Sequence, residues 1–255
     1  MQKSIGLDNL LSDNEFLRRE SELRSSTIAK QDIFGDVNAQ RHFNEGFVRR
    51  HYMLQSSRLF LAKCCSQFRK KPLSPYEATE SAIHLNAYYL NLCGALDNLA
   101  WVLQHEWQLL PSVTEDKNRN KCGLFKEDFL GSLNSRNLEL MNLFGQYKNW
   151  AKRLTDFRDP AAHRIPIYVP PSVITTQEQI DKFSSVLDQS NISSSFEIGD
   201  KPISEIYQEA QAVGNFEPLM VLSSTQGLLI YSIDRQIRSD HDIYLTIAKA
   251  IVDTV

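Results

Sequence analysis

The sequence predicts an all-α protein: a helical bundle with an irregular arm inserted at about residues 166–215. Glycine and proline are scarce, at 10 and 9 of 255 residues, below the roughly 12% that the two together reach in average proteins. Long proline-free stretches carry apolar residues at helical spacing. By contrast, Ile-Pro-Ile-Tyr-Val-Pro-Pro, from Ile165 to Pro171, cannot form a helix. We expect extended backbone in that segment.

The N-terminal part predicts a short helix followed by a long one. Residues 1–35 form an extension with a weak helix over about 12–23. Asp36 is suited to cap the next helix. Apolar residues then recur at steps of three, four and seven, so we expect this helix to reach about Phe68. It opens the core of the bundle, which we expect to span 36–165.

A central helix is predicted to begin at a capping box. Ser74 and Glu77 form the box, and Pro75 suits the first helical position. An apolar stripe at steps of three and four then runs on towards Pro111. Apolar residues beside the stripe, Ile83 among them, indicate that this helix is buried on much of its circumference.

A polar loop and a third long helix are expected next. The helix carries an apolar stripe from Leu140 to Phe157. The loop is interpreted either as a solvated segment or as a contact to a phosphate backbone. Its cationic residues are Lys117, Arg119, Lys121 and Lys126.

The rest of the chain is predicted to return to helix after the arm. Within the arm, Thr175 and Glu178 are suited to cap a short helix, and the Ser-rich stretch 190–200 is expected to be a loop. Helix is expected again over 203–212. A C-terminal unit over 216–255 is expected to be helical from Pro218, because Leu222, Leu229, Ile233 and Ile237 share a helical face.

Composition narrows the classes of function. The formal net charge is −3, which argues against a strongly basic protein that coats nucleic acid but leaves room for a local basic groove. The four cysteines show no C-x-x-C pair and no histidine at zinc spacing. We therefore expect neither a structural metal nor a cofactor. The histidines without a partner at i+3 or i+4 are expected to be structural; they are His42, His51, His84 and His105.

The N-terminal residues give no targeting signal. They lack the apolar core of a signal peptide. No run approaches the roughly 18 uncharged apolar residues that a membrane span needs. We expect a cytoplasmic protein without a membrane partner.

One segment carries a candidate site. Residues 157–164 read Phe-Arg-Asp-Pro-Ala-Ala-His-Arg, with Arg158 and His163 separated by four residues and Asp159 after the arginine. This resembles the R-x4-6-H motif of the HEPN superfamily of helical bundles. The resemblance implies a metal-independent endoribonuclease that works as a homodimer, in antiviral defence or with an antitoxin partner protein. It also covers family members that are not catalytic.

Local physics suggests how this motif is built. Pro160 suits a first helical position and disfavours helix at Asp159, so we expect Asp159 to cap a new helix. Arg158 can then fold back beside His163. An imidazole, a guanidinium and free helix-start amides together suit a phosphate. We name Arg158, His163 and Asp159 as catalytic candidates. For Asp159, we favour the role of a helix cap over that of a catalytic acid.

Several interpretations stay open at this stage. His163 can instead bond across a helix junction, and Arg158 can pair with Asp156 or Asp159. A second match to the motif, Arg235 to His241, lies in an apolar helical repeat. We interpret that arginine as a helix-surface residue.

The central helix also carries a polar pair beside the predicted site. Two interpretations of Asp97 and Asn98 stay open: they support the predicted site, or they form buried polar pairs within the bundle. The leading function is RNA cleavage. The alternatives are a non-catalytic module that binds a partner protein or RNA, and a regulator that binds a nucleotide.

Overall fold

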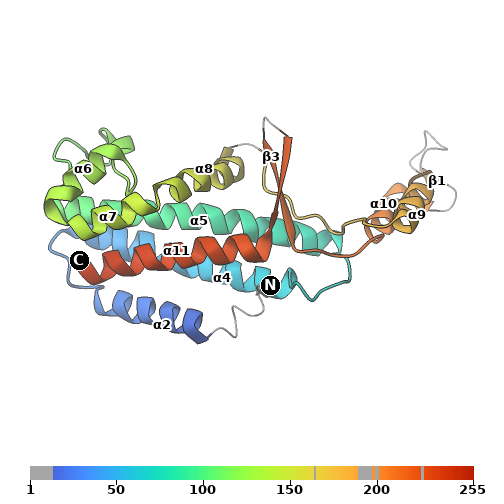
Figure 1. The fold of residues 1–255 in the computed structure, drawn as a ribbon, viewed down its shortest axis with the longest axis horizontal. Helices are drawn as coiled ribbons and strands as arrows, with labels where there is room; N and C mark the ends of the chain where they lie inside the picture. The colour runs from blue at the N-terminus through green and yellow to red at the C-terminus, as the bar shows by residue number, and fades with distance from the viewer. Residues whose placement is uncertain (1–13, 164, 189–196, 199–200, 225–226) are drawn as a thin grey trace.

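The protein is an elongated, mostly helical bundle with a small helical unit at one end (Figure 1). The computed structural model describes residues 14–163, 165–188, 197–198, 201–224 and 227–255. Of these, residues 14, 163, 197–198, 201–204 and 224 are described by their backbone only. The all-α class is therefore confirmed for the bundle, to which two short antiparallel hairpins are added.

The N-terminal helices follow the predicted order, with different ends. Asp36 caps the second helix as predicted, accepting from the amides of Asn38 and Ala39 at 2.7 and 3.1 Å. The expected reach to Phe68 is wrong, because the helix ends at Cys64 and Phe68 is exposed. The elements are α2 (Asn14–Ala29), α3 (Val37–Arg41), the π-helix η1 (His42–Val48) and α4 (Arg49–Cys64).

The central helix is α5 (Pro75–Trp107), and it packs against η1, α4, α8 and α11. The predicted capping box is present: Glu77 N donates to Ser74 Oγ at 3.2 Å, and Ser74 N donates to Glu77 Oε2 at 2.8 Å. Its apolar stripe is buried from Leu85 to Leu103. Ile83 is exposed instead of buried, because it lies on the outer side of the helix near its start.

The predicted third helix is divided into separate pieces. Asn137 caps α7, its Oδ1 accepting from Leu140 N at 3.0 Å, and α7 ends at a turn at Tyr147 before α8 begins. The polar loop before it gives way to helix α6, which the sequence analysis did not predict. The elements are η2 (Arg119–Lys121), α6 (Glu127–Arg136), α7 (Leu138–Gln146) and α8 (Lys148–His163).

The arm packs on the bundle as extended backbone, as predicted. Ile167 and Val169 are buried. Asn86 of α5 binds both the amide and the carbonyl of Ile167 at 3.0 Å. Beyond this segment lie α9 (Gln177–Asp188), β1 (Glu197–Ile198), β2 (Lys201–Pro202) and α10 (Ile203–Gln211). Most of the Ser-rich stretch 190–200 lies outside the described residues.

The expected helix from Pro218 is wrong, because a β-hairpin precedes the last helix. The elements are β3 (Leu219–Ser224), β4 (Gly227–Ser232) and α11 (Ile233–Thr254). Leu222 and Leu229, which were assigned to one helical face, are cross-strand partners in this hairpin. The hairpin lies beside the arm, where Tyr168 pairs with Val221. Only the part from Ile233 onward closes the bundle as a helix.

Candidate functional site

Arg158 of α8 lies in the wall of a cavity of about 580 Å³. The cavity lies between α5, the segment 122–126 and α8, and volumes of this size accept small organic ligands. The side chain of Arg158 is 41% exposed, so its guanidinium is open to a ligand. The other cationic residues of the wall are Lys126, Lys148 and Lys152.

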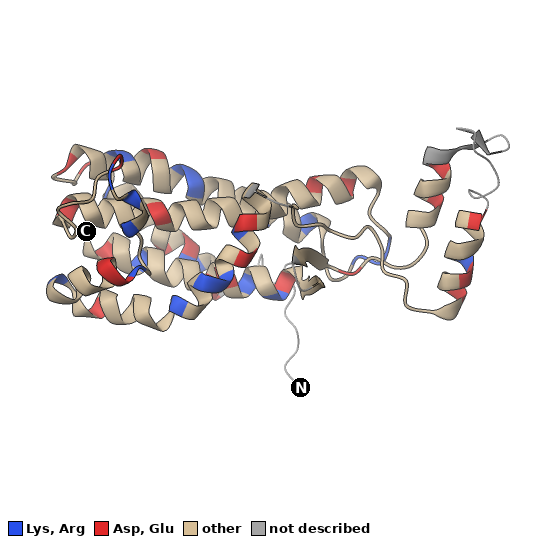
Figure 2. Cartoon of the chain, turned by 90° about the horizontal axis from the view of Figure 1, so that it is seen from above, with Lys and Arg blue, Asp and Glu red and all other residues tan. Residues whose placement is uncertain are grey.

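Two of these lysines form no ion pair within the described part of the chain. Lys148 pairs with Glu127 of α6. Among the described residues, no carboxylate lies within 4.0 Å of the ammonium group of Lys126 or Lys152. The cavity therefore carries positive charge that an anion can meet. The opposite end of the molecule, around α9 and α10, is mainly acidic (Figure 2).

Asp97 of α5 contributes the negative charge of the cavity wall. Burial raises the pKa of its carboxyl, while the charges of Arg158, Arg50 and Lys126 act in the opposite direction. Asp97 thus lies in the cavity wall, whereas Asn98 contacts His42 and donates to the carbonyl of Gly94. Burial also raises the pKa of Cys93 and of Cys122 to about 12. Both remain thiols at neutral pH, so neither supplies a thiolate nucleophile.

The expected break before Pro160 is not present. Helix α8 continues through Pro160 to His163, so Asp159 is not an N-cap. Tertiary packing explains the difference: Pro160 is buried, and Phe157 stacks on Tyr89 with ring centroids 4.5 Å apart. These contacts offset the hydrogen bond that proline removes from the helix.

The continuous helix changes how Arg158 and His163 relate to each other. Positions five residues apart lie about 140° apart around a regular helix, so the expected fold-back of Arg158 does not occur. The side chain of His163 lies outside the described part of the structure. Asp159 instead pairs with its neighbour, with its Oδ1 at 3.1 Å from Nε of Arg158.

The remaining sequence candidates are the cationic residues of the polar loop and the second motif match. Of the cationic residues of the predicted loop, Lys126 lines the cavity, whereas Lys121 pairs with Asp128 at 3.2 Å. Arg235 is exposed on α11, as predicted. Its motif partner His241 is fully buried, with Nε2 at 3.0 Å from Oε1 of Glu20. The second motif match is therefore no site.

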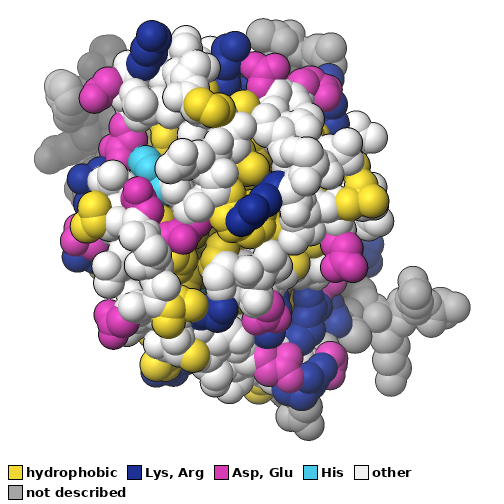
Figure 3. Space-filling model, turned by 90° about the vertical axis from the view of Figure 1, so that its left-hand side faces the viewer, with side chains coloured by type: hydrophobic (Ala, Val, Ile, Leu, Met, Phe, Trp, Pro, Cys, Tyr) yellow, Lys and Arg dark blue, Asp and Glu magenta, His cyan; other side chains and the backbone are white. Residues whose placement is uncertain are grey.

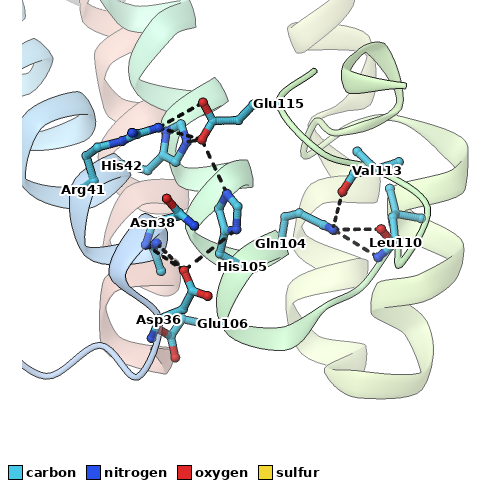
Figure 4. A network of polar contacts seen from close by, with 11 residues as sticks. Asp36, Asn38, Arg41, His42, Gln104, His105, Glu106, Leu110, Val113 and Glu115 are labelled. Carbon is cyan, nitrogen blue, oxygen red and sulfur yellow. Dashed lines mark hydrogen bonds and ion pairs between the residues drawn. The ribbon is translucent and has the colours of Figure 1, made fainter. Parts of the chain in front are cut away.

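A second polar cluster was missed by sequence analysis. His42, His105 and Glu115 each place one potential ligand atom within 4.8 Å of the others, although His42 lies far from the other two in the sequence (Figure 4). His42 begins η1, His105 lies in the last turns of α5, and Glu115 lies in the loop after it. No local spacing connects them, so only long-range packing identifies the cluster.

Comparison of the chain with protein-family models, curated proteins and solved structures found no significant match. Among the described helices, none has the length and apolar character that crossing a bilayer requires.

Proposed function

We propose that the protein is a metal-independent endoribonuclease of HEPN type whose Arg158 cavity binds RNA phosphates. The observation that supports this most is the gathering of Arg158, Lys126, Lys148 and Lys152 around one cavity in a chain with net charge −3. A guanidinium binds a phosphate through two parallel hydrogen bonds. Lysines around it add charge without fixing geometry.

The chemistry uses groups that RNA and the motif supply. A base takes the proton of the ribose 2′-OH, and O2′ forms a bond to phosphorus. The P–O5′ bond breaks, and an acid protonates O5′, leaving a 2′,3′-cyclic phosphate and a 5′-hydroxyl end. His163 is proposed for proton transfer, because imidazole titrates near neutral pH. Arg158 stabilises the charge on the pentacoordinate phosphorus, and Asp159 orients the guanidinium through Nε.

A homodimer would reconcile this chemistry with the continuous helix. One chain places Arg158 and His163 about 140° apart. Two copies pairing the ends of α8 across a two-fold axis can supply an arginine from one protomer and a histidine from the other. An antitoxin-like or defence-system partner protein fits the same proposal.

A non-catalytic module is the second candidate, and the continuous α8 favours it. Without a dimer, the motif does not gather its two residues on one helix face. The cavity would then bind a nucleotide or an RNA phosphate without cleaving it. RNA binding without cleavage is the behaviour that this candidate predicts.

Cleavage of mixed RNA by the full chain in excess EDTA tests the proposal. We expect cleavage to persist, and His163→Ala to lower its rate roughly 10²–10⁴-fold through loss of proton transfer. RNA affinity and the circular dichroism spectrum should stay unchanged. His84→Ala is the control, since His84 stacks on Phe60 away from the cavity. Equal rates for His163→Ala and the parent would contradict the catalytic assignment.

A further inference from the structure

In the cluster of His42, His105 and Glu115, the hydrogen bonds show which ring nitrogen of His42 carries a proton. Nδ1 of His42 lies 3.1 Å from Oδ1 of Asn98. The orientation of that amide is fixed, because its Nδ2 donates to the carbonyl of Gly94 at 2.6 Å. Asn98 Oδ1 can only accept, so Nδ1 of His42 carries the proton. Its other nitrogen, Nε2, then holds a lone pair in the neutral ring.

That lone pair faces an acceptor. Nε2 of His42 lies 3.0 Å from Oε1 of Glu115, and two acceptors at this distance need a cation or a further proton between them. A proton would satisfy this one pair. It would not satisfy Nε2 of His105, which lies 3.9 Å from the same oxygen. That nitrogen is buried and has no hydrogen-bond partner among the described residues.

A metal ion satisfies all three atoms at once. We propose that His42, His105 and Glu115 bind a divalent transition metal ion of the zinc class. Two imidazoles and a carboxylate are a known donor set for Zn²⁺, with the fourth position left to water. Bonds of about 2.0–2.1 Å in a tetrahedron place neighbouring ligand atoms about 3.4 Å apart. The observed separations of 3.0 and 3.9 Å lie on either side of that value.

The surroundings hold the ligands in place. His42 and His105 stack on each other with ring centroids 5.5 Å apart, and both stack on Trp101. Arg41 reaches both oxygens of Glu115, at 2.8 and 3.0 Å, and fixes the plane of the carboxylate. Figure 4 shows Arg41, His42 and His105 turned toward Glu115. Outer contacts of this kind orient metal ligands and set their affinity.

Gly46 of η1 makes the contact to Asn98 possible. A Cβ at Gly46 would lie 2.0 Å from Oδ1 of Asn98, so only glycine lets the amide reach His42. The site is also accessible: the side chain of Glu115 is 40% exposed. A space-filling view of this end of the bundle shows a histidine at the surface beside acidic side chains (Figure 3). A bound ion would connect α5, η1 and the loop that follows α5.

This inference does not rest on the proposed function. It contradicts the sequence-based expectation that the chain holds no metal. It also makes the two proposals separable, since chelation should empty this site and leave RNA cleavage intact.

Titration of the EDTA-treated full chain with Co²⁺ and then Zn²⁺ tests the site. We expect one equivalent of Co²⁺ to give the visible bands of tetrahedral coordination, with no thiolate charge-transfer band, and Zn²⁺ to displace it. The absence of the thiolate band separates this site from Cys64 and Cys65. Zn²⁺ should also raise the melting temperature, by an amount that grows with the logarithm of its free concentration over Kd.

Variants decide which residues hold the ion. His105→Asn and Glu115→Gln should each weaken Zn²⁺ binding by more than about 100-fold, and Asn98→Ala by roughly 10–100-fold. Glu115 lies in a loop, so its variant should fold normally even if His105→Asn does not. His84→Asn is the matched control and should bind like the parent. No saturable single equivalent in the parent, or full binding by Glu115→Gln, would overturn the proposal.

Discussion

Two regions of the molecule use arginine and histidine in opposite ways. Beneath α2, Arg58 is 1% exposed and donates from Nη2 to both oxygens of Glu20 at 2.8 and 2.9 Å. Nε2 of buried His241 lies 3.0 Å from Oε1 of the same carboxylate. At the other region, Arg158 is 41% exposed, pairs with Asp159, and lines a cavity together with three lysines. The same residue types therefore stabilise the fold where they are buried, and are accessible to a ligand where they are exposed.

The pKa of Glu20 reflects the buried groups around its carboxylate. Burial alone would raise it, but the hydrogen bond from His241 and the charge of Arg58 lower it overall. The carboxylate is thus ionised and holds the N-terminal helix on the bundle. The segment that the sequence indicated as a weak extension is docked through this buried ion pair together with the buried side chains of Phe16 and Leu23.

Removal of Glu20 should give the largest effect on stability. Glu20→Ala leaves Arg58 buried without its carboxylate, and breaking a buried pair from one side costs about 3–5 kcal/mol. Urea unfolding measures the loss. Glu22→Ala is the control on the same helix, because its pair with Arg18 is exposed and should change stability by less than about 1 kcal/mol. Equal effects of the two variants would show that the buried network does not hold α2.

Lowering the pH should destabilise the buried region next. Burial lowers the pKa of His51 to about 4, whereas in the unfolded chain it titrates near 6.5. Between these values the unfolded chain binds a proton that the folded chain does not, so stability falls as pH falls. The free energy of unfolding should drop by about 3 kcal/mol from pH 7 to pH 4 through this residue.

His51→Gln checks that assignment. His51 faces Tyr244, with Nδ1 at 2.9 Å from the hydroxyl, and lies near Glu20, Arg58 and His241. The variant should unfold with a smaller drop over the same pH range, even if it starts less stable. His84→Gln should keep the full drop. An unchanged pH dependence in His51→Gln would assign the effect to other groups.

The smallest effect is expected at the cavity lysines. If the cavity binds RNA as proposed, Lys152→Ala removes one phosphate contact, so the slope of log affinity for single-stranded RNA against log salt should fall by about 0.7. Fluorescence anisotropy at several salt concentrations measures it. Lys182→Ala, on exposed α9 at the acidic end of the molecule, should leave the slope unchanged. A slope equally altered by both changes would argue against a localised binding site.

The comparison also shows which features a sequence can predict. The caps at Asp36 and at Ser74 with Glu77 were predicted correctly, because a cap depends on residues within one turn. The buried arm was predicted because proline excludes helix. At Pro160 the same local rule failed, since the packing of Phe157 on Tyr89 keeps α8 continuous.

Other features depend on contacts that no local pattern contains. Leu222 and Leu229 are seven residues apart, a spacing shared by a helix face and by this hairpin, so periodicity alone chose wrongly. The cationic residues of the cavity come from separate segments of the chain. Two of them, Arg158 and Lys126, were named from the sequence. His42 and Glu115 are 73 residues apart in sequence, and their contact follows only from the packed bundle.

The most direct test compares the two arginines of the two motif matches. Cleavage of RNA in EDTA should fall at least about 100-fold in Arg158→Ala, because the transition-state charge loses its guanidinium. Arg235→Ala should cleave like the parent, since its side chain is exposed on α11 and its motif partner is held in the buried network. Both variants should stay folded. Equal cleavage by Arg158→Ala and Arg235→Ala would contradict the account.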